Sequence, residues 1–249
     1  MHSKSCPQYQ ACPYFAARRR LAEADVVVVN HDLLLSSIGT RLLPELGNSL
    51  LVLDEAHSLS QTAAEQFACE LDLSRLRWLD RATLTIATGL RQLTQKVDRP
   101  VDKMVRELRA ALHDSGQIAF ENLASGMREE DGVRRLKEHE IDALLREPLR
   151  TAQARASELL DVCTTLGQAA REAIQEAGGT ATPALASAYA DLGALAGRLS
   201  RVKQAADMLL ADGEEALTTA KRISVDARGG RTVAVRLHAS PSSRATSCG

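Results

Sequence analysis

The chain has 249 residues and a formal net charge of −1, with 45% hydrophobic but only 3% aromatic residues. This length allows one large core or two small ones, and the balanced charge argues neither for nor against a nucleic-acid partner. Because no stretch approaches the roughly 18 apolar residues of a membrane span and the N-terminus has no apolar signal core, we expect a cytoplasmic protein without a membrane partner.

The cysteines do not form the pattern of a secreted disulfide framework, because they are scattered and odd in number. They are Cys6, Cys12, Cys69, Cys163 and Cys248. Only Cys6 and Cys12 lie close together, and by themselves they could be ordinary thiols or part of a zinc site with His2. Cys69 and Cys163 fall in helical patterns and are predicted to be small core residues.

The first zone of the chain alternates short apolar runs with helical stretches. Residues 14–24 (YFAARRRLAEA) predict a helix, and residues 31–37 (HDLLLSS) predict a short one. Residues 25–30 (DVVVVN) and 50–54 (LLVLD) predict fully buried strands, because continuous apolar runs without alternation are typical of a parallel sheet covered on both faces. Two such strands do not make a complete sheet.

Two polar clusters in this zone each have two interpretations. Arg18, Arg19 and Arg20 lie on one predicted helix, where they form either a phosphate-contacting patch or an exposed face. Asn30 and His31 follow the first predicted strand. Either they have a functional role, or they simply cap the next helix, as Asn does well.

The acidic sequence DEAH, residues 54–57, follows the second predicted strand. Carboxylates at the carboxyl end of a buried strand suit magnesium–nucleotide chemistry, since open α/β sheets bind ligands at that edge and Mg²⁺ prefers oxygen ligands. The adjacent Glu55 can orient and deprotonate the water that attacks a γ-phosphate. The alternative is a strand followed by a helix with acidic residues near its N-terminus.

Between residues 70 and 221 the strand signals vanish and apolar residues recur at helical spacing. One predicted helix face carries Leu159, Val162, Leu166 and Ile174, and another carries Leu185, Tyr189, Leu192, Leu199, Val202 and Leu209. Residues 176–183 (EAGGTATP) predict a helix end, a loop and a proline-led start. This zone is rich in arginine, which is typical of a solvated face. The arginines include Arg91, Arg99, Arg106, Arg109, Arg134 and Arg135.

The last zone is short. Residues 222–239 show two alternating runs around an RGG turn, which predicts a β-hairpin. Residues 242–249 are small, polar and without periodicity, and we expect them to be disordered.

Several of these motifs together resemble the iron–sulfur DNA helicases of the DinG and YoaA type, relatives of XPD in helicase superfamily 2. They are Cys-x5-Cys, F-x-A-R, ADVVVVNH-x-LLL and LLVLDEAH, over about residues 5–68. The resemblance is weaker over the helical zone and returns at residues 235–241 (VRLHASP). It implies an ATP-dependent helicase that moves 5′ to 3′ on single-stranded DNA in repair or replication, with ATP, Mg²⁺ and a [4Fe–4S] cluster as cofactors.

The resemblance also implies roles for individual residues. Asp54 matches the residue that holds Mg²⁺, Glu55 the residue that activates water, and His57 the residue that couples the nucleotide site to DNA. Cys6 and Cys12 match the last two of the four cluster ligands. The match places Asn30 and His31 near the nucleic-acid path, where Arg18 and Arg19 are further candidates for contacting DNA.

The resemblance predicts a fold class and a division of the chain. We expect an α/β remnant of a RecA-like motor domain plus a mainly α-helical, arch-like domain, helix-rich overall. The expected parts are the C-terminal part of the cluster domain (1–24), a part of motor domain 1 (25–69), the arch-like domain (70–221), a hairpin that returns to the motor (222–241) and the tail (242–249).

The chain departs from the family pattern in several ways. It contains no G-x-x-x-x-G-K-[ST] phosphate loop and no Q-x-x-G-R segment, and Met1 stands where the family has a third cysteine. We therefore expect an internal piece of a helicase that is catalytically silent alone, and a replication or repair protein is a candidate partner. The alternatives are a non-enzymatic helical module that binds single-stranded DNA or a protein, and a gene product without a stable fold.

Overall fold

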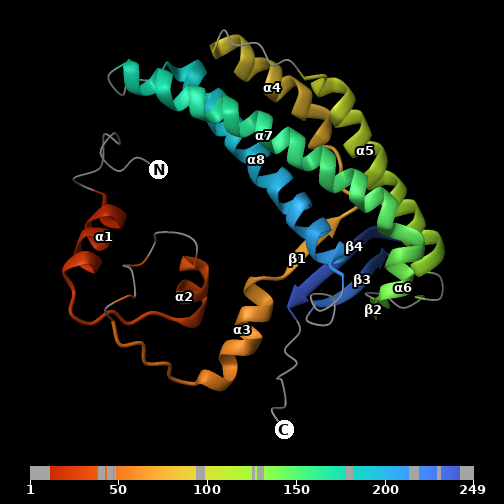
Figure 1. Ribbon diagram of the computed structural model, residues 1–249, viewed down its shortest axis with the longest axis horizontal. Coiled ribbons are helices and arrows are strands. Elements are labelled where there is room, and N and C mark those ends of the chain that lie inside the picture. Colours follow the sequence, from red (N-terminus) through yellow and green to blue (C-terminus); the bar gives the residue numbers. More distant parts are fainter. Residues whose placement is uncertain are drawn as a thin grey trace. The chain divides into compact units, whose positions relative to one another are not determined.

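The computed structural model describes residues 12–38, 43, 47, 49–93, 99–124, 127, 132–177, 182–212, 219–228 and 231–241. The chain forms two compact units, of which the first ends at Phe67 and the second begins at Ala68 (Figure 1). Cys6, the RGG turn and the tail 242–249 lie wholly or partly outside the described residues, so their predicted roles and structures stay predictions.

The described part of the first unit is built from short helices. They are α1 (Pro13–Glu23), α2 (His31–Ser37), the 3₁₀ turn η3 (Ala56–Ser58) and α3 (Leu59–Gln66). Helix α1 begins with Pro13, whose missing N–H is not needed in the first turn. Both helices predicted before residue 38 are confirmed, and α2 has the predicted bounds.

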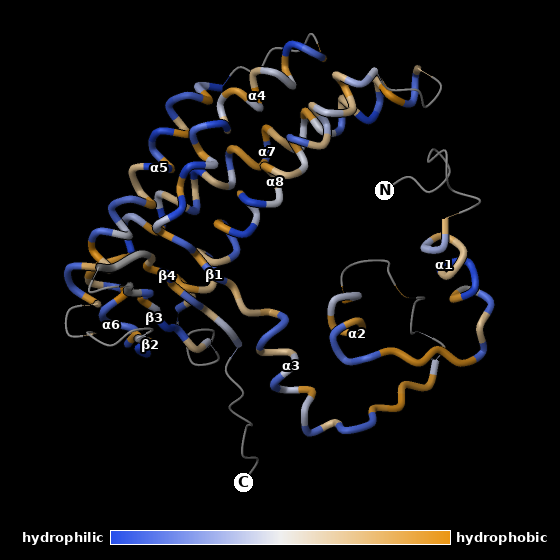
Figure 2. Tube along the Cα trace, turned by 180° about the vertical axis from the view of Figure 1, so that it is seen from behind, coloured by the Kyte–Doolittle hydropathy of each residue, from blue (hydrophilic) through white to orange (hydrophobic). Residues whose placement is uncertain are grey.

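The two buried strands predicted at 25–30 and 50–54 are wrong. Neither segment belongs to a strand, and their apolar side chains are largely exposed: Val28 is 91% exposed and Leu50 is 90% exposed. Figure 2 shows the two segments as hydrophobic stretches of the trace. An apolar segment becomes a buried strand only when neighbouring strands and covering helices supply partners, and the described residues of this unit supply none.

Four long helices pack side by side in the second unit (Figure 1). They are α4 (Leu79–Leu93), α5 (Val101–Ile118), α7 (Arg146–Glu176) and α8 (Pro183–Leu210). Helix α5 continues into the π-helical turn η4 (Ala119–Leu123), and the short helix α6 (Glu138–Glu140) leads through the π-helical turn η5 (Ile141–Leu145) into α7. The predicted helical zone is confirmed, as is the proline-led start of α8, which Thr182 caps.

An antiparallel sheet of four strands lies at one end of these helices (Figure 1). Its strands are β1 (Cys69–Asp72), β2 (Gly132–Arg135), β3 (Thr219–Arg228) and β4 (Arg231–Pro241), in the order β1-β4-β3-β2. The predicted hairpin is confirmed as β3 and β4. The expectation that strands vanish between 70 and 221 is wrong, since β1 and β2 pair with the hairpin. Each has only four residues, too few to show a strand period in the sequence.

The core of the second unit joins the helices to one face of the sheet. Helices α7 and α8 bury Leu159, Leu166 and Leu199, each 0% exposed. The sheet adds Ile223 and Leu237, which lie opposite each other on β3 and β4.

The two cysteines predicted to be core residues are both buried in this core. Cys163 lies on α7, as its helical pattern predicted, whereas Cys69 begins β1 and is not in a helix. Among the described residues, no helix is long and apolar enough to cross a membrane.

Candidate nucleotide and nucleic-acid site

Asp54 and Glu55 form a tight turn at the start of η3. The backbone N–H of Glu55 donates to Asp54 Oδ1 over 3.0 Å, and Ser58 N donates to the carbonyl of Glu55 over 2.9 Å. Glu55 has φ 49° and ψ 41°, in the left-handed region, which residues other than glycine rarely adopt. Such local strain is found preferentially at functional sites. Both residues are exposed, so solvent and solutes can reach their carboxylates.

His57 lies beside Glu55 on the surface. Its Nδ1 is 3.1 Å from Glu55 Oε2, with the two side chains 80% and 71% exposed. Water screens an ion pair this open, so it holds the two groups near each other with little effect on stability. The three residues predicted to act on nucleotide therefore lie within one turn of chain.

His31 connects this turn to α2. Its Nε2 donates to the carbonyl of Asp54 over 3.1 Å, and its Nδ1 lies 3.2 Å from Ser58 Oγ. Because a carbonyl only accepts, Nε2 must carry a hydrogen in this arrangement. The imidazole thus holds together two segments that are far apart in the sequence.

Asn30 is the N-cap of α2. Its Oδ1 accepts a hydrogen bond of 2.9 Å from the backbone N–H of Leu33, which lies in the first turn and has no carbonyl partner within the helix. The capping interpretation is therefore confirmed for Asn30. The proposed contact with nucleic acid remains a prediction.

The arginines of α1 lie near its aromatic residues. Arg18 Nη1 donates to the hydroxyl of Tyr14 over 3.2 Å, while Tyr14 and Phe15 pack edge to face. Arg19 is exposed. Both interpretations of this basic cluster stay predictions.

Of the two predicted cluster ligands, the structure describes only Cys12. Cys12 is half-buried at the start of α1, and no group of three or more His, Cys, Asp or Glu side chains in the described ranges could hold a metal ion. Cys163 is buried in the other unit, where desolvation raises the pKa of its thiol to about 11, and burial also raises the pKa of Cys69. Both thiols are therefore less readily ionised than an exposed cysteine, as expected for core residues.

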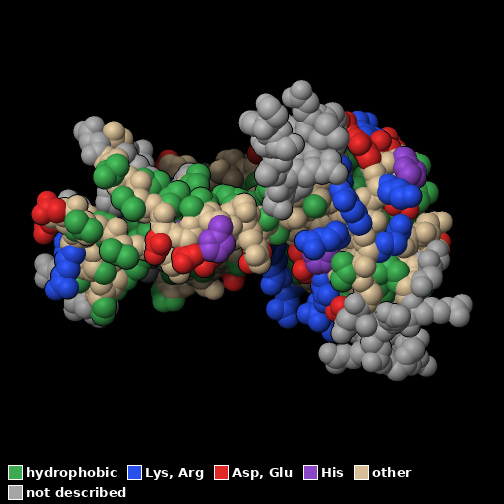
Figure 3. Space-filling model, turned by 90° about the horizontal axis from the view of Figure 1, so that it is seen from below, with side chains coloured by type: hydrophobic (Ala, Val, Ile, Leu, Met, Phe, Trp, Pro, Cys, Tyr) green, Lys and Arg blue, Asp and Glu red, His purple; other side chains and the backbone are tan. Residues whose placement is uncertain are grey.

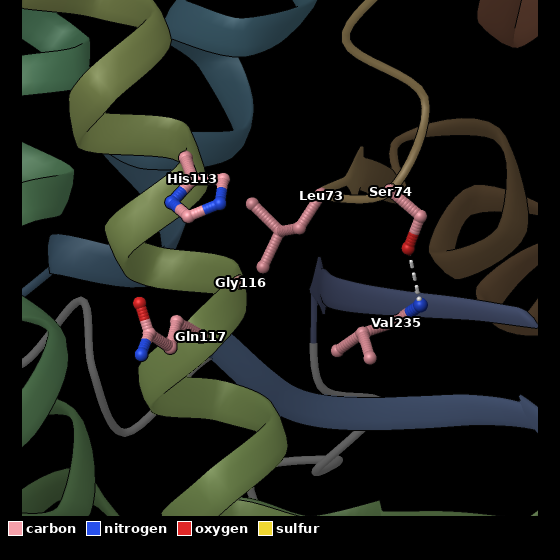
Figure 4. A pocket seen from close by; sticks show the side chains of 6 residues that line it. All are labelled: Leu73, Ser74, His113, Gly116, Gln117 and Val235. Atoms are coloured by element: carbon pink, nitrogen blue, oxygen red, sulfur yellow. Dashed lines mark hydrogen bonds between the residues drawn. The ribbon is translucent and has the colours of Figure 1, made fainter. Parts of the chain in front are cut away.

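A cavity of about 340 Å³ and a second of about 440 Å³ lie in the second unit, and sequence reasoning found neither. The second is shown in Figure 4, and it is lined by His113 and Gln117 of α5 together with Leu73, Ser74 and Val235. Ser74 Oγ accepts a hydrogen bond of 2.7 Å from Val235 N, which joins the residues after β1 to β4. None of the predicted site residues that the structure describes lines either cavity.

Comparisons with known proteins agree with the motifs in the first unit. Residues 3–76 match the family model described as DEAD_2. The chain is 32% identical over 145 residues to the ATP-dependent DNA helicase DinG of Photobacterium profundum, covering 56% of this chain and 21% of that helicase. It is 37% identical over 103 residues to the DinG helicase of Salmonella choleraesuis, and 36% over 104 residues to that of Escherichia coli.

The resemblance to DinG-type helicases is therefore confirmed. The two shorter alignments each cover 40% of this chain and 14% of the relative. The aligned part of the chain thus spans about a fifth or less of the length of these curated relatives.

Proposed function

We propose that the chain is one part of an ATP-dependent DNA helicase, and that residues 25–67 contribute the acidic corner of its RecA-like nucleotide site. The observation that carries this proposal is the pair of hydrogen bonds that join His31 to the carbonyl of Asp54 and to the hydroxyl of Ser58. They bring together the two motifs, NH and DEAH, that carry the resemblance to the helicases.

Within that site the two carboxylates take different roles. Asp54 supplies an oxygen ligand to the Mg²⁺ that accompanies ATP, since Mg²⁺ prefers carboxylate and water oxygens. Glu55 accepts a proton from the water that attacks the γ-phosphate. His57 is proposed to couple that carboxylate to bound DNA, and its contact with Glu55 at 3.1 Å supports this role.

The same proposal assigns single-stranded DNA as the partner. The proposed path of the DNA strand runs past Asn30, His31, Arg18 and Arg19. The second unit corresponds in this proposal to an arch-like domain. The resemblance implies 5′ to 3′ movement, a cytoplasmic role in repair or replication, and a cluster held with the help of Cys6 and Cys12 in the longer protein. The family match over residues 3–76 supports the assignments in the first unit, and those of the second unit rest on the proposal alone.

The 249-residue chain alone is proposed to be inactive as an ATPase. Phosphate binding in such motors requires backbone N–H groups and a lysine from a glycine-rich loop, and this sequence contains no such motif. Movement along DNA further requires two motor domains that change their relative position. The acidic turn alone has no means of holding the triphosphate.

The experiment measures ATP hydrolysis and binding of a fluorescent oligonucleotide by the purified chain, next to the Glu55→Gln variant. We expect binding of single-stranded DNA that weakens with salt, and no hydrolysis above the variant. DNA-stimulated hydrolysis that disappears in Glu55→Gln would refute the proposed inactivity. Absence of DNA binding would refute the DNA partner.

The flanking DNA tests the motor assignment directly. If the chain is part of a helicase motor, an adjoining reading frame carries a phosphate loop and two further cysteines upstream of Cys6. A flanking sequence without either would contradict the assignment.

A second candidate is a non-enzymatic binding module formed by the second unit. It is favoured by the separate core of that unit, which joins four helices to a sheet. DNA binding without hydrolysis is expected from both candidates, and only the flanking motor motifs distinguish them.

A further inference from the structure

The sheet of the second unit has one face in the core and one face in contact with solvent. Side chains alternate along β3, so Ile223 and Val225 are buried while Arg222 is exposed. On β2, Arg134 and Arg135 point to opposite faces for the same reason. Arg134 pairs with Glu140 at 2.8 Å, whereas Arg135 is exposed on the solvent face.

Four residues form one row across the solvent face. The register places Arg135 opposite Arg222, Arg222 opposite His238, and His238 opposite Glu70. Side chains directly opposite each other on antiparallel strands have Cβ atoms about 5 Å apart. The Cβ atoms of two arginines therefore lie about 5 Å apart at the β2–β3 end of the row.

The charges of this face are unevenly neutralised. In the neighbouring row, Arg236 is surrounded by carboxylates: Asp226 at 2.7 Å, Glu70 at 3.3 Å and Asp72 at 3.8 Å. Within the described ranges, no carboxylate lies within 4.0 Å of a guanidinium nitrogen of Arg135 or Arg222. Like charges directly opposite each other destabilise a sheet, so this pair is a cost to folding unless an anion binds to it.

The third member of the row adds a hydrogen-bonding group. His238 Nε2 lies 2.7 Å from Ser224 Oγ, and its Nδ1 lies 3.7 Å from Glu70. Burial is the main cause that lowers the pKa of His238, and the nearby Arg222 and Arg236 act in the same direction. The positive charge of the row is therefore concentrated on Arg135 and Arg222.

We propose that Arg135 and Arg222 form a phosphate-binding site that holds the backbone of a nucleic-acid strand against the solvent face of the sheet. Guanidinium groups donate two parallel hydrogen bonds to phosphate oxygens, and a pair on one face can hold one phosphate group or two successive ones. The inference rests on the proposed function for its partner, DNA, but it assigns a binding surface to the second unit and not to the DEAH turn.

The chemistry of the surface favours a phosphodiester backbone over bases. In the described part of the sheet, these rows carry no Phe, Tyr or Trp on which a base could stack, and the imidazole of His238 is only 28% exposed. Val133, 62% exposed, is the large apolar residue beside the arginines. Figure 3, seen from below, shows Lys and Arg side chains gathered around the sheet end of the second unit. Binding here is expected to be independent of base sequence.

The test compares the full chain with the double variant Arg135→Gln, Arg222→Gln by fluorescence anisotropy with a labelled oligonucleotide at several salt concentrations. We expect the affinity to fall roughly tenfold or more, as charge-assisted hydrogen bonds are removed. The slope of log K against log[salt] should become shallower by about 0.7 for each phosphate that the variant no longer neutralises.

A matched control is Arg198→Gln, Arg201→Gln, which removes the same charge from two exposed arginines of α8. An equal loss of affinity in this control would show that net charge, and not the pair on the sheet, governs binding, and would overturn the proposal. So would an unchanged affinity in the sheet variant while the parent chain binds DNA. If the parent does not bind DNA at all, the proposed function fails together with this inference.

A second measurement does not depend on DNA. Inorganic phosphate at matched ionic strength should raise the Tm of the parent chain at millimolar concentrations, and should do so less for the sheet variant, because the anion relieves the repulsion between the two arginines. Displacement of the oligonucleotide by inorganic phosphate at micromolar concentration would instead identify free phosphate as the ligand and overturn the assignment of the backbone.

Discussion

Asn30→Ala tests whether Asn30 acts through the cap of α2. The substitution removes the acceptor of the hydrogen bond from Leu33 N. Loss of an N-cap of this kind costs about 1 kcal/mol, which corresponds to an increase of about fivefold in the helix-opening equilibrium. Helix α2 has seven residues, of which only Leu35 is buried, so packing contributes little to compensate for the loss.

Hydrogen exchange of the α2 amides measures this opening directly. We expect the protection of residues 34–38 to fall about fivefold in Asn30→Ala and to be largely retained in Asn30→Ser, whose hydroxyl also caps. Thr182→Ala is the matched control, because Thr182 caps α8 in the same way, by accepting from Leu185 N. It should leave the exchange of α2 unchanged.

Unchanged exchange in Asn30→Ala would refute the reasoning from the cap. The same variants separate the cap from a DNA contact. If Asn30 acts only through the cap, Asn30→Ser binds single-stranded DNA as the parent chain does. A loss of affinity in Asn30→Ser equal to that in Asn30→Ala would instead assign the amide a contact with DNA.

Two further predictions concern the second unit. The pKa of Glu140 is lowered, mainly by the hydrogen bond from Lys137 N and then by Arg134, so its contribution to stability is present above the unfolded value of 4.5 and is lost as pH falls through the folded pKa. Denaturation should therefore give Glu140→Gln a lower free energy of unfolding than the parent chain at pH 7, and this difference should disappear in acid. A difference that does not change with pH would contradict this cause. Leu159→Ala should lower the free energy of unfolding by about 2–5 kcal/mol in a urea titration, because Leu159 is 0% exposed, whereas Leu84→Ala, at a position 61% exposed, should have little effect.

Local sequence was sufficient to place α1, α2, α7, α8 and the hairpin. The helix α2 follows from a capping Asn30 before an apolar run, and the break between α7 and α8 from two glycines followed by Thr182 and Pro183. These signals act over a few residues. The DEAH motif was likewise readable as a sequence pattern, since its residues are contiguous.

The wrong predictions all concern pairing between distant segments. The runs 25–30 and 50–54 have the composition of buried strands, but burial depends on neighbours that those residues do not contain. Conversely, the four residues of β1 carry no strand signal and become a strand because β4 offers a hydrogen-bonding edge.

The sequence by itself determined the positions of α1, α2, α7, α8 and the hairpin, and which acidic residues are candidates for nucleotide chemistry, because these depend on short-range propensity and on contiguous motifs. Only the tertiary structure decided that His31 meets the turn at Asp54, and that Arg135 and Arg222 stand opposite each other. Both depend on register and packing between segments separated by many residues, which residue order alone does not specify.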